Sequence, residues 1–141
     1  MDRGHFFAIG VAVIWGLIYA IDGKILTKIA PGHLIFVHSF LVALLTAPFF
    51  LCTDGIKAIR SLDHATQLLT GATVLLAIVA NMGILIAIQR LGPSMASSFE
   101  ISYPFFVILF SMFLFGERLS IPVVIGGVFI CIGSLIIIRY G

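Results

Sequence analysis

The sequence predicts an all-α integral membrane protein with five transmembrane helices, and three observations support this fold class. Hydrophobic residues make up 61% of the 141 residues, charged residues only 10%, and the mean hydropathy is +1.23. Five apolar segments follow one another, each close to the roughly 20 residues that cross a bilayer as a helix. The connections between most of them are short and contain glycine or proline. A chain of this length has room for one domain, over residues 1–141.

The apolar runs place the five spans at about residues 6–29, 32–52, 67–89, 94–115 and 121–138. Arg3, just before the first run, gives that segment the appearance of a signal peptide. No small-x-small cleavage site follows Ile21, however, so we expect a retained span.

The connections have the chemistry of helix ends. Gly92-Pro93 combines a C-capping glycine with a proline suited to a first helical turn, which predicts a tight antiparallel hairpin between spans three and four. Ser120 can cap the fifth span, and Pro122 then falls in its first turn. In the longer connection, residues 53–66, apolar residues recur at helical spacing beside charged ones, which predicts a short interfacial helix.

The fourth span contains the most informative pair of residues, Glu100 and Pro104. A carboxyl group at mid-membrane is expensive unless it faces protein or a water-filled cavity. Proline has no N–H, so the carbonyl of the residue four positions earlier, here Glu100, loses its helical partner. We therefore expect a kink at Pro104 and a proton- or cation-binding role for Glu100. The alternative is a structural ion pair with Lys24, or a permanently protonated acid.

Other polar residues are weaker candidates for a substrate or proton site. Ser97 and Tyr103 fall on or beside the Glu100 face, where either can bind substrate or only hold helices together. His38, in the second span, can relay protons, and Asn81, in the third, can line a cavity or bond between helices.

On the first span, Trp15, Tyr19 and Asp22 form one stripe that can receive an organic substrate. Aromatic residues in membrane helices also serve as interfacial belts, although Trp15 lies deep for that purpose. Asp22 and Lys24 lie near a span end, where side chains that snorkel to the surface are the simpler explanation. Lys24 stays a candidate for a substrate or counter-ion role.

Gly126 and Gly133 lie seven residues apart on the fifth span, nearly on one face. Small residues at this spacing let two helix backbones approach, so the pair predicts either a dimer interface or packing within the chain. Cys52 and Cys131 are too few for a disulfide framework and are expected to be packing residues.

Lysine and arginine residues are evenly divided between the two membrane faces that five spans would create. One face has Arg3, Lys57, Arg60 and Arg118, and the other has Lys24, Lys28, Arg90 and Arg139. Insertion in both orientations, followed by antiparallel pairing, explains this balance. Chance, or a partner chain that fixes the orientation, explains it equally well.

Several short motifs together resemble the EamA-type domain of the drug/metabolite transporter superfamily over about residues 7–139. They are Trp15-Gly16 followed by Lys24 and Lys28, the run from Leu91 through Ala96 to Tyr103-Pro104, the segment Phe115-Gly116-Glu117-Arg118-Leu119-Ser120, and Gly126-Gly127 with Gly133. Many members resemble two such units fused as inverted repeats of ten helices. This chain is similar to a single five-span unit, one half of that arrangement, as in the bacterial and archaeal five-span branch.

The resemblance implies a transporter of small metabolites or drugs that works by alternating access in a bacterial cytoplasmic (inner) membrane. It implies a dimer, either a homodimer, for which antiparallel pairing would reproduce the inverted repeats, or a pair with a paralogous five-span chain. Two positions depart from the family pattern. His38 stands where many relatives have arginine, and Tyr103, rather than an acid, precedes Pro104.

No sequence feature points to an enzyme. The chain has no GxGxxG, P-loop or HExxH motif and no Cys/His spacing typical of a metal site, so no cofactor is expected. The net charge of +2 gives no reason to expect a nucleic-acid partner. Two rival interpretations remain: an accessory subunit of a heteromeric transporter, and a membrane scaffold whose polar residues only join helices.

Overall fold

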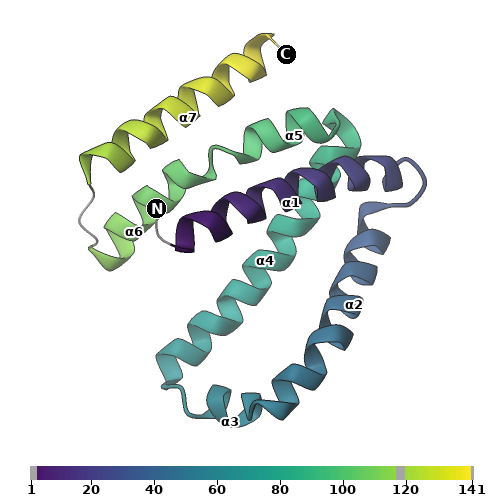
Figure 1. The fold of residues 1–141 in the computed structure, drawn as a ribbon, viewed down its shortest axis with the longest axis vertical. Coiled ribbons are helices and arrows are strands. Elements are labelled where there is room, and N and C mark those ends of the chain that lie inside the picture. The colour runs from purple at the N-terminus through teal and green to yellow at the C-terminus, as the bar shows by residue number, and fades with distance from the viewer. Residues whose placement is uncertain (1–2, 117–119, 141) are drawn as a thin grey trace. The chain divides into compact units, whose positions relative to one another are not determined.

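The computed structural model describes residues 3–116 and 120–140, and these are almost entirely helical (Figure 1). The described residues are 89% helical and contain no strand. The helices are α1 (Arg3–Ile25), α2 (Pro31–Cys52), α3 (Gly55–Arg60), α4 (His64–Leu91), α5 (Pro93–Glu100), α6 (Tyr103–Phe115) and α7 (Ile121–Tyr140). The segment 117–119, which contains the Glu117-Arg118 pair of the family motif, lies outside the described residues.

The five predicted spans are present as helices long and apolar enough to cross a membrane, so the all-α membrane fold is confirmed. They are α1, α2, α4, the α5–α6 pair (Pro93–Phe115) and α7. The first span ends at Ile25, earlier than the expected residue 29. Ala30 precedes Pro31 and has extended backbone (ψ 149°), because a residue before proline is forced out of the helical region, and the chain turns over residues 26–29 to reach it.

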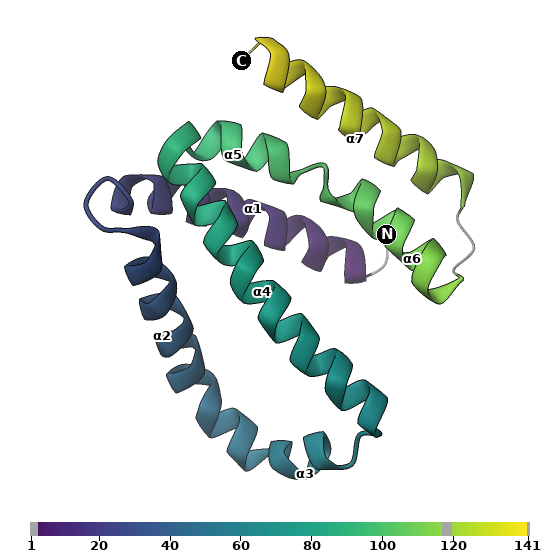
Figure 2. The same cartoon turned by 180° about the vertical axis from the view of Figure 1, so that it is seen from behind.

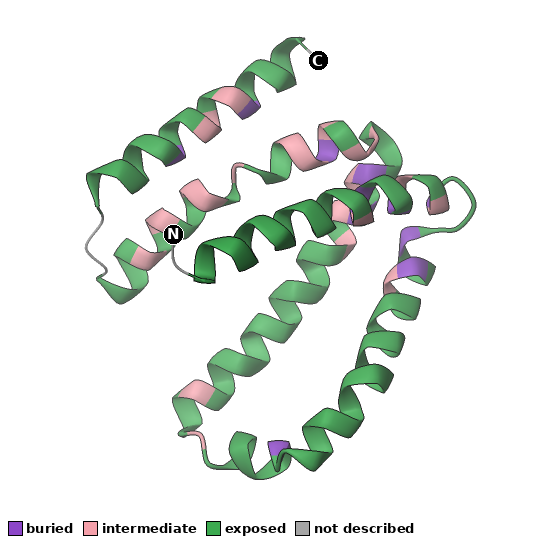
Figure 3. Cartoon of the chain, viewed as in Figure 1, coloured by how far each residue is buried: buried purple, intermediate pink, exposed green. Residues whose placement is uncertain are grey.

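Most of each spanning helix is exposed, as Figure 3 shows by the extent of green ribbon. Large apolar side chains such as Leu45 and Phe113 are 77% and 76% exposed. A water-soluble chain would bury such side chains, because each gains about 1.5–3 kcal/mol on leaving water. In a bilayer the hydrocarbon tails cover them, and the helices satisfy their own backbone groups.

The described residues form two compact units. One comprises α1 up to Lys24 and the chain from Ala87 onward, and the other is Ile25–Ile86. In the first unit, α7 packs against α5 and α6, as both views show (Figure 1; Figure 2). Gly127 and Ser134 are the buried residues of α7. The close approach depends on Gly127, since a Cβ there would lie 3.0 Å from Ile108 Cδ1.

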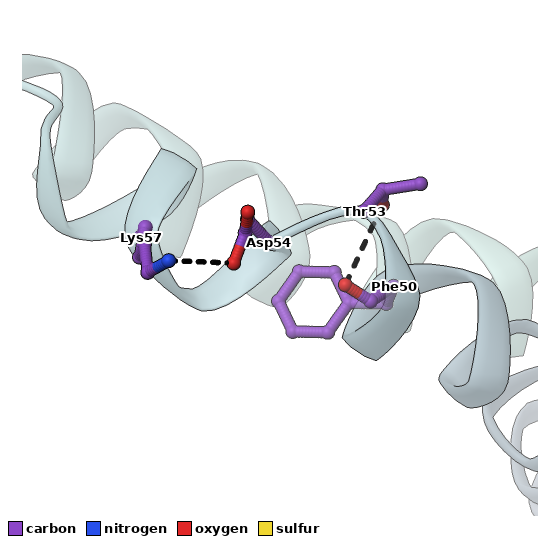
Figure 4. A network of polar contacts seen from close by, with 4 residues as sticks. All are labelled: Phe50, Thr53, Asp54 and Lys57. Carbon is purple, nitrogen blue, oxygen red and sulfur yellow. Dashed lines mark hydrogen bonds and ion pairs between the residues drawn. The ribbon is translucent and has the colours of Figure 1, made fainter.

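The second unit contains α2, α3 and most of α4, with Leu34 and Leu85 buried. A sharp turn joins α2 to α3 (Figure 4). Thr53 Oγ1 donates to the Phe49 and Phe50 carbonyls at 2.8 and 3.5 Å, and Asp54 takes a left-handed φ of 54°. Gly55 is required there, because a Cβ would lie 2.3 Å from the Phe50 ring. The short helix α3 lies in the segment 53–66, where the sequence predicted one.

The α4 helix begins with a side-chain cap. Asp63 Oδ2 accepts a hydrogen bond from Thr66 N at 3.1 Å, and Thr66 Oγ1 donates to Asp63 Oδ1 at 2.5 Å. These bonds stabilise the carboxylate, first through the Thr66 hydroxyl and then through its N–H, and they lower the pKa of Asp63. At its other end α4 ends at Leu91, and Gly92, with a φ of 83°, is the single residue that connects it to Pro93, so the connection is as short as predicted.

The fourth span is interrupted, but not at Pro104 itself. The α5 helix ends at Glu100 and α6 begins at Tyr103, with Ile101 and Ser102 in turn conformation between them. Tight bonds of the i→i+3 type cross the break: Ser102 N donates to Phe99 O at 3.3 Å and Phe105 N to Ser102 O at 3.1 Å. The expected kink is thus a helix break. It places Pro104 in the first turn of α6, where a backbone N–H has no acceptor within its own helix and proline is well tolerated.

Candidate functional site

The feature on which the candidate site depends is a hydrogen bond between two spanning helices of the first unit. The hydroxyl of Tyr19, on α1, donates to Oε2 of Glu100, the last residue of α5. The two residues are 81 positions apart in the sequence. Tyr19 is 8% exposed, whereas Glu100 is exposed, so the carboxylate has a buried donor on one side and an open side elsewhere.

The α1 side of the site is the predicted stripe of residues at i, i+4 and i+7. Trp15 meets Tyr19 edge to face, with ring centroids 5.7 Å apart and an interplanar angle of 69°. Trp15 itself is 47% exposed. Such T-shaped pairs are favourable and fix the orientation of both rings. The stripe therefore presents an accessible indole next to a buried phenol that holds the acid.

Asp22 continues this stripe and corrects an expectation. We expected it to snorkel to the membrane surface with Lys24, but Asp22 is only 4% exposed, whereas Lys24 is exposed. Its position three residues after Tyr19 puts it on the face of α1 that packs inward, and that spacing was visible in the sequence.

The packing that joins α1 to α5 uses a glycine. A Cβ on Gly23 would lie 3.0 Å from both Cδ and Cγ of Pro93, the first residue of α5. The absence of a side chain at Gly23 thus lets α1 approach the beginning of α5. Ala96 of α5 is also buried. The Tyr19–Glu100 hydrogen bond lies one helical turn before Gly23 on α1.

The remaining fourth-span candidates lie near Glu100 without bonding to it. Ser97 Oγ donates to the Ser94 carbonyl of its own helix at 3.0 Å. Tyr103 is 61% exposed. Pro104 is half-buried in the first turn of α6.

His38 and Asn81 belong to the second unit, and both are exposed. Asn81 Nδ2 donates to the Ala77 carbonyl of its own helix at 2.8 Å. The candidate site is therefore built from the first unit alone: Trp15, Tyr19, Asp22, Glu100 and Tyr103.

The two glycines of α7 differ from their immediate neighbours. A Cβ on Gly126 or on Gly133 would meet no atom within 4 Å. Gly127 and Ser134, one position further along, are buried against the rest of the unit. The contact of α7 with α5 and α6 thus uses one row of small residues and leaves the adjacent row open.

The site has the chemistry of binding. It combines carboxylates, a phenol and an indole, which can hold a cation, a proton and an organic ring. Across residues 3–116 and 120–140, the structure brings together no group of three or more His, Cys, Asp and Glu side chains that could hold a metal ion.

Comparison with known proteins identifies one family. The sequence profile of the EamA-like transporter family matches residues 2–139, almost the whole chain. No match was found among curated proteins or among solved structures. The five candidate spans fit a single five-span unit of that family, and its members are transporters. The chain is therefore a multi-pass membrane protein that belongs to the EamA-like transporter family.

Proposed function

We propose that the chain is a subunit of a dimeric secondary transporter that moves small organic metabolites or drugs by alternating access across the bacterial cytoplasmic membrane. Glu100 exchanges a proton or an organic cation in this mechanism. The Tyr19–Glu100 hydrogen bond carries the proposal, because it places an ionisable group of one spanning helix against a buried donor of another. An ionisable residue inside a span is a functional candidate by default.

The interrupted fourth span supports the same role. Discontinuous helices in transporters place binding residues at the ends of half-helices near mid-membrane. Glu100 occupies such an end, at the last position of α5 and directly before the turn at Ile101 and Ser102. A break at this point lets α5 and α6 change their relative angle while each half keeps its own hydrogen bonds.

Three observations support a dimer. One five-span unit corresponds to half of an inverted-repeat pathway, so a second unit completes it. The lysine and arginine residues are balanced between the two faces, which insertion in both orientations and antiparallel pairing would explain. The open Gly126 and Gly133 row supplies a surface that another helix backbone can approach closely.

The direct test is flux into proteoliposomes that contain the purified full chain. Candidate amines and metabolites are offered with and without a pH gradient, to wild type, to Glu100→Gln and to Asp63→Asn. The last variant makes the same change of acid to amide outside the spans and serves as the matched control. We expect gradient-driven flux in wild type and Asp63→Asn, and its loss in Glu100→Gln.

Flux that is unchanged in Glu100→Gln contradicts the Glu100 mechanism. A different outcome favours the scaffold interpretation: wild-type proteoliposomes show no flux, and Glu100→Gln lowers the thermal stability of the protein. Flux that appears only when a second five-span chain is added identifies the chain as a subunit of a heteromer.

Orientation is tested with a single cysteine. Both native cysteines, Cys52 and Cys131, are replaced by serine, and Tyr140→Cys is introduced at the end of α7. The antiparallel homodimer predicts that membrane-impermeant thiol reagents modify this cysteine from both sides of the membrane. Modification from one side only eliminates the antiparallel homodimer and leaves a parallel dimer or a paralogous partner.

A further inference from the structure

We propose that the membrane face at which α1, α4 and α7 end binds the headgroups of anionic phospholipids, such as phosphatidylglycerol, through Lys24, Arg90 and Arg139. The bound molecule is a component of the surrounding bilayer and not the transported solute. The proposal therefore goes beyond the proposed function, and it holds or fails without it.

Acidic residues are divided unequally between the two membrane faces, although lysine and arginine are balanced. By their places in the sequence, four of the six acidic residues belong to the face that bears Lys57 and Arg60; they are Asp2, Asp54, Asp63 and Glu117. Of the other two, Glu100 lies within the fourth span and Asp22 is only 4% exposed. Among the described residues, the face at the ends of α1, α4 and α7 therefore has basic side chains and no exposed acidic one.

Three basic residues of this face lie at helix ends of the first unit. Lys24, Arg90 and Arg139 occupy the last turns of α1, α4 and α7, and all three are exposed. Long basic side chains near the end of a span reach the headgroup level of the bilayer. Lys28 follows in the turn after α1 and is also exposed. The face thus presents several positive charges where lipid phosphates lie.

The packing of α1 against the beginning of α5 brings two of these charges close to each other. Lys24 adjoins Gly23, where a Cβ would lie 3.0 Å from Pro93 Cδ, and Arg90 precedes Pro93 by three residues. The end of α7 lies on the same side of the unit in both views (Figure 1; Figure 2). Basic residues from different helices can therefore approach one headgroup, and arginine binds phosphate through two parallel hydrogen bonds.

Arg139 has a neighbour that is typical of the membrane interface. Its guanidinium carbon lies 5.7 Å from the centroid of the Tyr140 ring, and Tyr140 is 78% exposed. Tyrosine at the end of a span is characteristic of the headgroup level. A cation–π contact uses no hydrogen-bond donor, so the guanidinium keeps its N–H groups for phosphate oxygens.

The unequal distribution of acidic residues favours anionic lipids at one face. Acidic residues have little influence on the orientation in which a chain inserts. They do cancel the attraction between basic residues and an anionic lipid, which is worth about fivefold in binding for each lysine or arginine near the surface. The two faces are thus equal for insertion and unequal for lipid binding. Zwitterionic phosphatidylcholine gains less, because its own ammonium group offsets the charge of its phosphate.

Lipid selectivity is measured on the purified full chain in detergent. Phosphatidylglycerol and phosphatidylcholine with identical acyl chains are offered in equal amounts, and native mass spectrometry counts the molecules of each that stay bound. We expect wild type to retain phosphatidylglycerol with a preference of about tenfold or more, since several basic residues act together. Added sodium chloride should reduce this preference, because salt screens exposed charges.

Two double variants assign the preference to one face. Arg90→Gln with Arg139→Gln should remove most of it, whereas Arg90→Lys with Arg139→Lys keeps the charge and should preserve it. The matched control is Lys57→Gln with Arg60→Gln, which removes the same charge from the opposite face and should leave the preference unchanged. Thermal unfolding in lipid-free detergent shows whether any variant has lost its fold.

Several results overturn the proposal. Equal retention of the two lipids by wild type does so, as does an equal loss of preference in the two glutamine double variants. A preference that persists in Arg90→Gln with Arg139→Gln, together with a lower unfolding temperature, shows that these arginines serve only the helix dipoles. Displacement of phosphatidylglycerol by inorganic phosphate, but not by chloride at matched ionic strength, identifies a site for free phosphate instead. None of these measurements involves flux, so each leaves the proposed function as it stands.

Discussion

Glu100 and Asp63 are both carboxylates that accept a hydrogen bond from a hydroxyl group, yet they represent opposite kinds of interaction. The donor of Asp63 is Thr66, three residues along the chain, and the bond caps the helix that follows. The donor of Glu100 is Tyr19, 81 residues away, and the bond joins two spanning helices. The first interaction stabilises a helix end that would form anyway, whereas the second depends on the packing of the unit.

The surroundings of the two carboxylates make their bonds unequal in strength. Asp63 is exposed, so water competes for both of its oxygens. The Tyr19 hydroxyl is largely removed from solvent, and hydrogen bonds strengthen where the local dielectric constant is low. We therefore expect loss of the Tyr19 donor to have a large effect on function and loss of the Thr66 donor to have a small one.

The largest effect is expected for Tyr19→Phe compared with Thr66→Val. Hydrogen bonds to charged groups contribute about 1.5–3 kcal/mol, which corresponds to roughly tenfold or more in binding. Tyr19→Phe should reduce solute affinity and flux by that factor, since the ring stays and only the donor to Glu100 is lost. Thr66→Val should leave flux unchanged. Equal behaviour of the two variants would contradict the difference between the two carboxylates.

This difference also explains what the sequence predicted and what it did not. Local signals, such as the short connection at Gly92-Pro93 and the helix in residues 53–66, depend on neighbours in the chain and could be read directly. The Glu100–Tyr19 pair could not, because it depends on how α1 and α5 pack. Each residue was a candidate alone, but nothing in the sequence paired them.

One prediction was wrong because packing overrides local chemistry. Asp22 near a span end suggested snorkelling, but the inward face of α1 buries it. The break in the fourth span is different, because it follows from local chemistry. Pro104 predicted a kink, and the chain breaks at Ile101 and Ser102, in the turn before the proline, which begins α6.

The next largest effect is expected for Gly23→Ala, which attacks the packing behind the long-range pair. The new Cβ would lie 3.0 Å from the rigid ring of Pro93, and overpacking of this kind costs about 1–3 kcal/mol. We expect a lower unfolding temperature and reduced flux. Gly16→Ala is the control on the same helix, because its Cβ meets nothing within 4 Å. It should be neutral or slightly stabilising, since alanine favours helices.

A smaller effect is expected from two adjacent glycines of α7. Gly127→Ala would meet the flexible end of Ile108 at 3.0 Å, so it should lower thermal stability slightly without changing the oligomeric state. Gly126→Ala meets nothing within 4 Å among the described residues, so it should leave the stability of the subunit unchanged and weaken the dimer if this row forms the dimer contact. Light scattering of the detergent-solubilised protein at several concentrations measures the dimer fraction. An unchanged dimer in Gly126→Ala would remove this row from the proposed interface.

The smallest effect is expected at Asp63, where the local cap can be tested through pH. The pKa of Asp63 is lower in the folded chain than its usual value of 3.8, because the Thr66 hydroxyl and N–H stabilise the charged form. Its stabilising contribution is therefore fully present above the unfolded pKa and is lost as the pH falls through the folded pKa.

Asparagine is an equally good N-cap, so Asp63→Asn changes the charge and keeps the cap. The unfolding temperature of wild type should exceed that of Asp63→Asn slightly near neutral pH, and the two should converge in acid below about pH 4. A gap that widens in acid would show that the Asp63 carboxylate is destabilising, and the contrast with Glu100 would then need a different explanation.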